Sequence, residues 1–504
     1  MGFGGRKLSI SSLLQPRRPR AQTTATGIFR FLDLPQDLLE LVIITTRPAD
    51  VLALERTCKA VRAITSERRI WLDIAEVVAQ QTGMFLQRFL FDNMSLSDIQ
   101  RFALSPDLFT RRLKSLGQAK KPTRSTFRLQ PRTQRVLPEF CPAKDPVWDR
   151  SYATHLTLVS GGRYILAAHE NATETHLRLL RLSDASDGTL EIFEIATQSL
   201  PGACRLHDHW NPRRHPDVLR LAMLERTPQS SRIAIFDVNT ATERPDLTLV
   251  RRTSDLLPKS YSHSALYHCD EARIVFCGEC AIAIWEFTTD QLLTLDAPAP
   301  RSFHDRYLAQ VIDKRVLYFS RDMILLYLLP EDASGHLGAL TFSFELLLST
   351  EGTDNIYFQQ PVVPHKPFTF HIHSWPSDTL RTYELPSCAA VLTAHPPRPV
   401  RRPRILQREG CESPRNPWAV QGPAPLAACG GTHFVPRLSP WLHSALLWLE
   451  PGVGVGDGGE VRAGHAELVH RDDFARAQGI AFDPATGRLC VANHAGSLLV
   501  ADYV

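Results

Sequence analysis

Apolar residues recur at helical spacing through the first quarter of the chain. The runs Leu38–Val42 and Val51–Val61 place apolar side chains at positions i, i+3 and i+4 or one turn further on, and charged residues of the second run fall on its other faces. A third run, Ile70–Val78, continues the pattern. This spacing predicts a group of short amphipathic helices between residues 28 and 116.

Polar residues between these runs are the expected helix starts. Asp50 is suited to cap the second helix and Ser66 the third, because a side-chain oxygen can accept a hydrogen bond from a free backbone N–H. Ser95–Asp98 has the spacing of a capping box, which predicts a helix that continues through Phe102. The pair Ser105–Pro106 then predicts the start of another short helix.

From about Trp148 to the end, the period of the pattern changes to two. Short apolar runs alternate with turn residues, and several share a loose template in which apolar or aromatic residues are followed by an acid. The seven runs start 41 to 75 residues apart, and a four-stranded propeller blade takes about 40–45 residues. The pattern therefore predicts an all-β propeller of six or seven blades, with a β-sandwich or two smaller β domains as the alternative. The runs are Leu177–Leu182, Ile233–Val238, Ile282–Phe287, Met323–Leu328, Phe370–Trp375, Ala445–Glu450 and Leu498–Tyr503.

Charge divides the chain further. The net charge is only +4, but residues 1–32 contain six basic residues and no acid, and residues 108–138 contain nine basic residues and no acid. The rest of the chain therefore carries 4 − 6 − 9, or −11. An acidic folded bulk argues against specific binding of nucleic acid by the main folded surface.

These boundaries give a multidomain organisation, as expected for 504 residues. We expect a disordered basic tail at 1–27, an all-α module at 28–116 and a basic, proline-containing linker at 117–146. The β-propeller then occupies 147–504. A segment rich in proline, arginine and glycine, 396–440, is expected to form a loop inserted in the propeller.

Composition limits the cellular compartments in which we expect the protein. No apolar run approaches the roughly twenty residues of a membrane-spanning helix, and the N-terminus lacks the pattern of a secretory signal. Ten irregularly spaced cysteines suit a reducing compartment. We therefore expect a cytoplasmic or nuclear protein with no membrane span.

The segment Leu34–Trp71 resembles an F-box of the fungal type. The matching positions follow the order of the F-box pattern: a Leu-Pro opening, an apolar helix, an Asp-led second helix that runs to a cysteine, and a closing apolar-Trp pair. Thr57 and Val61 depart from it, standing where valine and tryptophan are common. The matches are Leu34, Pro35, Gln36, Asp37, Leu38, Leu39, Val42, Ile43, Asp50, Val51, Leu52, Leu54, Cys58, Ile64, Ile70 and Trp71.

Three short helices cannot bury all of these apolar side chains among themselves, so some must face a partner. The resemblance implies that this partner is the Skp adaptor of a cullin-based ubiquitin ligase, and that the propeller holds an unknown protein substrate. We expect a non-catalytic, cofactor-free adaptor subunit. The expected adaptor-binding residues are Leu34, Pro35, Leu38, Leu39, Val42, Ile43, Val51, Leu52, Leu54, Cys58, Ile64 and Trp71.

Three alternatives to this interpretation stay open. The helices of Leu34–Trp71 would then only cap the β domain, or the protein would be a scaffold for a partner other than the Skp adaptor. The third alternative is a metal-dependent enzyme with its site at the centre of the propeller. It draws on the histidines, all 19 of which lie at or after His155.

Few residues point to chemistry. The pairs His207/His209 and His371/His373 could each align two imidazoles on one face of a strand, but no further ligand is evident. Cys277 and Cys280 form a lone CxxC that is typical of a hairpin turn between two strands. The glycine-rich segment 454–459 formally matches GxGxxG without the strand and helix of a dinucleotide site. We predict no catalytic or metal site.

Overall fold

The computed structural model describes one helical region and one region of β-sheets in the 504-residue chain. Between residues 297 and 478 the description covers the backbone of the strands alone. The other described residues are 31–117 without 83, 86–90 and 92–93; 127–296 without 129, 139, 141–152, 171–173, 185–189, 213–214, 216, 227–230, 243–244, 254–264, 269–271 and 278–280; and 479–504 without 484 and 494–496. The predicted tail 1–27 and the glycine-rich segment 454–459 lie outside the described residues.

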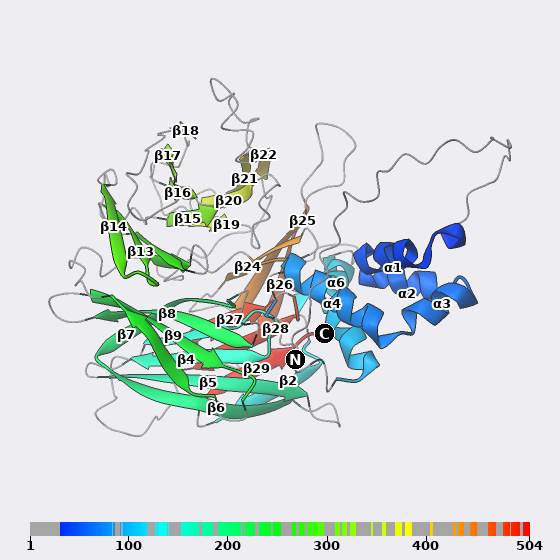
Figure 1. The fold of residues 1–504 in the computed structure, drawn as a ribbon, viewed down its shortest axis with the longest axis horizontal. Coiled ribbons are helices and arrows are strands. Elements are labelled where there is room, and N and C mark those ends of the chain that lie inside the picture. The colour runs from blue at the N-terminus through cyan, green and yellow to red at the C-terminus, as the bar shows by residue number, and fades with distance from the viewer. Residues whose placement is uncertain are drawn as a thin grey trace.

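The helices predicted from the apolar spacing are present and gather on one side of the molecule (Figure 1). We call residues 31–117 the helical module. Its elements are η2 (Phe31–Asp33), α1 (Gln36–Thr45), α2 (Pro48–Glu55), α3 (Lys59–Thr65), α4 (Arg68–Thr82) and α6 (Leu96–Gly117). No helix in the described part of the chain is both long and apolar enough to cross a membrane.

The starts of α2 and α4 differ from the prediction. The second helix begins at Pro48 rather than after Asp50, because proline's fixed φ suits the first helical position, where its missing N–H costs nothing. Ser66 does not cap α4; its hydroxyl instead donates back to the Arg62 carbonyl at the end of α3 (2.6 Å). The Ser66 hydroxyl therefore binds the end of α3, and it does not cap α4 as we expected.

The capping box that opens α6 is confirmed. The Asp98 N–H donates to Ser95 Oγ, and the Ser95 N–H donates to Asp98 Oδ2, each at 3.2 Å. The predicted helix start at Ser105–Pro106 is wrong, because α6 runs on through Pro106. Proline cannot donate to the Phe102 carbonyl four residues earlier, and the Ser105 hydroxyl donates to that carbonyl instead (2.8 Å).

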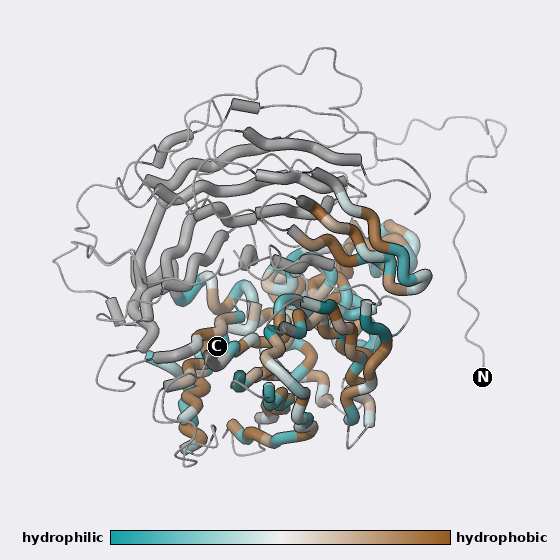
Figure 2. The backbone as a smooth tube through the Cα atoms, turned by 90° about the vertical axis from the view of Figure 1, so that its left-hand side faces the viewer, coloured by the Kyte–Doolittle hydropathy of each residue, from teal (hydrophilic) through white to brown (hydrophobic). Residues whose placement is uncertain are grey.

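Trp71 lies in the apolar core of the helical module. It is fully buried, and its Nε1 donates to the Thr65 carbonyl (2.8 Å), so the one polar atom of the ring is satisfied. Buried side chains from α1, α2, α4 and α6 surround it, among them Ile43, Val51 and Ile99. Figure 2, seen from the left-hand side of Figure 1, shows brown, hydrophobic stretches alternating with teal, hydrophilic ones in the described part of the chain.

The described strands form seven sheets, in which every strand pair is antiparallel except one. The first is β3 (Ala153–Leu158), β4 (Tyr164–Glu170), β5 (Glu174–Asp184) and β6 (Leu190–Pro201); the second is β7 (Ala203–Trp210), β8 (Val218–Arg226), β9 (Ser231–Asn239) and β10 (Leu247–Arg252). The third is β11 (Ala265–His268), β12 (Arg273–Cys277), β13 (Ala281–Glu286) and β14 (Gln291–Asp296), and the fourth is β15 (Leu308–Ile312), β16 (Arg315–Phe319), β17 (Met323–Leu328) and β18 (Phe344–Glu345).

The last three sheets follow the same plan. The fifth is β19 (Asn355–Phe358), β20 (Phe368–Ser374), β21 (Thr379–Leu385) and β22 (Arg404–Leu406). The sixth is β23 (Ala427–Cys429), β24 (Thr432–Arg437), β25 (Ser444–Glu450) and β26 (Arg462–Val469), with β1 (Phe127–Arg128) added in parallel to β26. The seventh is β27 (Ala477–Asp483), β28 (Arg488–Asn493) and β29 (Leu498–Asp502), completed by β2 (Thr133–Leu137).

Each run of the predicted template lies in a different sheet. Six runs supply the third strand, namely β5, β9, β13, β17, β25 and β29, and the Phe370–Trp375 run falls in the second strand, β20. The third strands β5 and β9 are buried on both faces, because the apolar clusters on the two sides of each sheet take alternate side chains, so each strand reads as a nearly continuous apolar run. This series of four-stranded antiparallel sheets has the organisation of propeller blades.

Apolar side chains fill the spaces between neighbouring sheets. One cluster, which includes Leu166 and Leu221, joins the first and second sheets, and another, which includes Ile235 and Trp285, joins the second and third. A third cluster joins the first sheet to the seventh, and β27 lies against β3. The last sheet of the chain therefore packs against the first.

Two segments differ from the predicted organisation. Residues 133–137, which we assigned to the linker 117–146, form β2 and pair with β29, and residues 127–128 form β1. The predicted loop 396–440 supplies β22, β23 and β24. Strand β2 pairs with β29, about 365 residues further along the chain, and β22 and β23 have only three residues each, so local periodicity does not reveal these strands.

Candidate partner-docking face

Helix α1 has two apolar faces. Leu39 and Ile43 are spaced by one turn and lie buried in the core of the helical module, 5% and 0% exposed. Leu38, Leu41 and Val42 lie on the other side of the helix and are 44%, 56% and 39% exposed. A helix that needed only to cover its own core would carry polar residues on that second side.

Leu32 extends the exposed apolar set. It lies in η2, which directly precedes α1, and is 48% exposed. We call Leu32, Leu38, Leu41 and Val42 the docking face. We call the sheets formed by strands β1 to β29 the β-region. Figure 1 shows α1 at the end of the molecule away from these sheets, so the β-region leaves it open to a partner. Contiguous exposed apolar side chains of this kind mark interaction sites on soluble proteins.

A charged contact fixes α1 on α4. Arg69 of α4 forms an ion pair with Glu40 of α1 (Nη2 to Oε2, 2.8 Å), and the Gln36 amide donates to the other carboxylate oxygen (3.0 Å). The hydrogen bond from Arg69 is the main reason that the pKa of Glu40 lies below its usual value. The pair lies at the surface and contributes little free energy, but it orients the helix that carries the docking face.

A second ion pair ties the other end of the module together. Arg47, just before α2, contacts Asp107 of α6 (Nη2 to Oδ1, 3.0 Å), and this hydrogen bond raises the pKa of Arg47. Helices α1 and α4 and helices α2 and α6 are thus each joined by a side-chain pair as well as by the apolar core.

The twelve residues predicted to bind the Skp adaptor fall into three groups. Four are buried in the core of the module: Leu39, Ile43, Val51 and Trp71. Five are half-buried: Leu34, Leu52, Leu54, Cys58 and Ile64. Three are exposed: Pro35, Leu38 and Val42. Partner contact by these residues stays a prediction.

The sequence interpretation omitted two members of the docking face. Leu41 could have been found, since it shares the i, i+3, i+4 stripe of Leu38 and Val42. Leu32 carried no periodic signal, because it precedes the helix in a single 3₁₀ turn.

The residues proposed for chemistry do not form a site among the described side chains. A β-bulge falls at His207, since Leu206 pairs with Met223 and Asp208 with the adjacent Ala222, so the simple alternation that would align His207 with His209 is broken. No group of three or more His, Cys, Asp or Glu side chains that could hold a metal occurs in the described part of the chain.

Cys277 ends β12 and Ala281 begins β13, which confirms the predicted hairpin around the CxxC. His371 and His373 lie in β20, but their side chains are outside the described residues, as is the side chain of Cys277.

Comparisons with known proteins give a fold-level resemblance only. No family model matches the chain, and no curated protein matches it. Among solved structures, the chain is similar to Sqt1 from Chaetomium thermophilum (11% identity, 69% of this chain and 82% of that chain, TM-score 0.37). It is also similar to the WD40 domain of SCAP from fission yeast (12% identity, 70% and 85%, TM-score 0.39) and to the periplasmic gluconolactonase PpgL of Pseudomonas aeruginosa (11% identity, 63% and 86%, TM-score 0.39). None of these comparisons identifies an F-box.

Proposed function

We propose that this protein recruits substrates to a Skp–cullin ubiquitin ligase, with the docking face binding the Skp adaptor and the β-region binding a protein substrate. The supporting observation is that α1 exposes Leu38, Leu41 and Val42, which are not part of the apolar core of the module. The resemblance of Leu34–Trp71 to an F-box supplies the identity of the partner.

We further propose that the seven sheets close into a seven-bladed propeller. Two features support closure. Strand β2, from before the first sheet, completes the last sheet by pairing with β29, and β27 of the last sheet lies against β3 of the first. Closure of this kind removes free sheet edges and leaves the loops at the ends of the ring to bind a partner. Catalysis then belongs to a separate ubiquitin-charged enzyme that acts on the bound substrate by proximity.

Binding of a purified Skp adaptor to the full chain tests the proposal. The double variant Leu38→Glu/Leu41→Glu places two charges on the docking face, and both positions are exposed, so the fold is retained. Since each buried leucine anchor contributes about 1.5–3 kcal/mol, we expect affinity to fall by about 100-fold or more.

Leu249→Glu is the matched control. Leu249 is 44% exposed, as Leu38 is, but it lies on β10 of the second sheet. The control is expected to bind the adaptor like the unchanged protein. If the unchanged protein does not bind, or the double variant binds within about twofold of it, the assignment of this partner to the docking face is wrong.

A further inference from the structure

The turn between β27 and β28 inserts into the helical module, some 370 residues away in sequence. Ala485 of this turn is only 2% exposed and belongs to the apolar cluster that contains Trp71 and Ile43. Phe482, at the end of β27, lies against Phe109 of α6 with ring centroids 5.5 Å apart. The core of the helical module is therefore built partly from the last sheet of the chain.

Gly487 shows how closely the two parts fit. Its φ is +66°, a conformation that residues with a side chain rarely adopt. A Cβ atom at this position would stand 2.6 Å from the Phe109 ring and 2.8 Å from Val504 Cγ2. Phe109 is itself fully buried, so the ring has no room to move aside.

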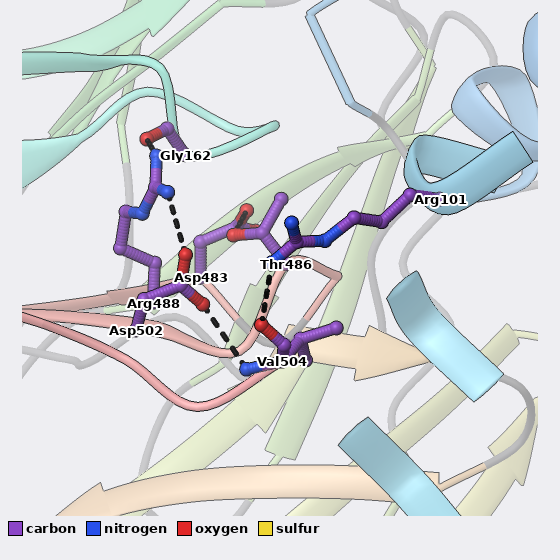
Figure 3. Close-up of polar contacts among 7 residues, drawn as sticks. All are labelled: Arg101, Gly162, Asp483, Thr486, Arg488, Asp502 and Val504. Atoms are coloured by element: carbon purple, nitrogen blue, oxygen red, sulfur yellow. Dashed lines mark hydrogen bonds and ion pairs between the residues drawn. The ribbon is translucent and has the colours of Figure 1, made fainter. Parts of the chain in front are cut away.

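The final residues of the described chain are held by two arginines of α6. Arg101 donates to the Val504 carbonyl (3.0 Å), as Figure 3 shows, and Arg112 donates to the Tyr503 carbonyl (2.6 Å). Arg112 also donates to the carbonyl of Gln130, just before β2 (2.7 Å). Both strands at the outer side of the seventh sheet are thus tied to the same helix.

The turn is fixed equally firmly on its sheet side. The Asp483 carboxylate accepts from Thr486 Oγ1 (2.6 Å) and from the Gly161 N–H in the β3–β4 turn (3.2 Å). Arg488 donates to the Gly162 carbonyl (2.8 Å) and to Asp502 (2.7 Å). The side chains converge on one point between the first sheet, the seventh sheet and the helical module (Figure 3).

We infer that the helical module reaches its stable fold only when the seventh sheet is complete. A chain that lacks Phe482–Val504 uncovers the side of the Phe109 ring that faces Phe482, leaves the position of Ala485 empty and removes the Val504 and Tyr503 carbonyls that accept from Arg101 and Arg112. The docking face is carried by this module, so it is presented in ordered form only by a chain whose last strands have folded. The coupling makes the order of the helical module depend on the seventh sheet, and it stands whether or not the partner is a Skp adaptor.

Hydrogen exchange on the full chain tests the inference without any partner. Gly487→Val pushes a side chain against Phe109 and is expected to speed amide exchange in α4 and α6 by about tenfold or more. Gly202→Val is the matched control, because Gly202 also has a positive φ (+82°) but lies between β6 and β7. The control is expected to leave exchange in α4 and α6 unchanged.

The inference is overturned if Gly487→Val accelerates exchange in β27–β29 while α4 and α6 keep their protection. If Gly487→Val does not fold, the milder pair Arg101→Met/Arg112→Met decides the question by the same readout, since it removes the bonds from α6 to Val504, Tyr503 and Gln130 without adding a side chain to the core. Exchange in α6 that stays within about twofold of the unchanged protein in that variant also overturns the inference.

Discussion

The ion pair between Arg488 and Asp502 gives a sharp test of how the seventh sheet is held. The two side chains are 8% and 9% exposed, and their N–O distance is 2.7 Å. Asp502 Oδ1 also accepts from the Val504 N–H (3.1 Å), and Arg488 also donates to the Gly162 carbonyl (2.8 Å). Arg488→Met keeps much of the apolar stem and removes every one of the arginine's hydrogen bonds.

The expected cost follows from what the substitution leaves behind. The Asp502 carboxylate stays buried without its charged partner, and the Gly162 carbonyl loses a donor. Breaking a buried pair from one side costs about 3–5 kcal/mol, against a total stability of about 5–15 kcal/mol for a typical domain. The double variant Arg488→Met/Asp502→Asn removes the uncompensated charge, so it should recover at least half of that loss.

Urea unfolding followed by circular dichroism measures both variants. Arg62→Met is the control, because Arg62 pairs with Glu55 at 3.5 Å but its side chain is 70% exposed, and such a pair contributes about 1 kcal/mol or less. A loss below about 1 kcal/mol for Arg488→Met, or a double variant less stable than the single one, would refute the reasoning.

Two further predictions concern titratable groups. Burial, followed by the charge of Arg178, lowers the pKa of His169 from 6.5 to about 4, so the unfolded chain takes up a proton first as the pH falls. Stability should therefore fall between pH 6.5 and pH 4 with a slope of up to about 1.4 kcal/mol per pH unit, and His169→Gln should remove that part of the slope in pH-dependent urea unfolding. Burial also raises the pKa of the Cys204 and Cys490 thiols to about 12, so their thiolate fraction at pH 8 is about 10⁻⁴. Mass spectrometry after brief alkylation should find the half-buried Cys58 modified before Cys204 and Cys490, and early modification of Cys490 would contradict its burial.

Local patterns predicted the parts of the fold that depend on local interactions. The capping box at Ser95 and the apolar runs of the third strands are such parts, since each is decided within a few residues. The prediction of a helix start at Ser105–Pro106 was wrong because the Ser105 hydroxyl replaces the hydrogen bond that proline cannot donate to the Phe102 carbonyl. A general rule that proline breaks a helix does not include such a replacement. Strand β2 could not be read from the sequence, because its partner β29 lies about 365 residues further along the chain.

The sequence predicted helix α1 but not which of its apolar residues are exposed, for a physical reason. Helix α1 is apolar on two sides, so periodicity alone does not reveal which side faces the core and which faces outward. The choice is made by α4, whose apolar stripe takes Leu39 and Ile43, and by the Glu40–Arg69 pair that orients the helix. Only tertiary packing decides which of the predicted binding residues are buried and which are exposed.

A continuous chain of contacts leads from the docking face to the sheets, and it bears on the proposed function. Helix α1 packs on α4, and the Phe85 N–H, shortly after α4, donates to the Ser160 carbonyl in the β3–β4 turn (2.7 Å). Helix α6 closes the other side by packing against the last sheet. Because these contacts join the helices to the sheets directly, the proposed function places a substrate held by the sheets in a fixed direction from the docking face. Proximity catalysis gains from such fixed geometry, since the entropy of positioning the substrate is lost on folding rather than at each encounter.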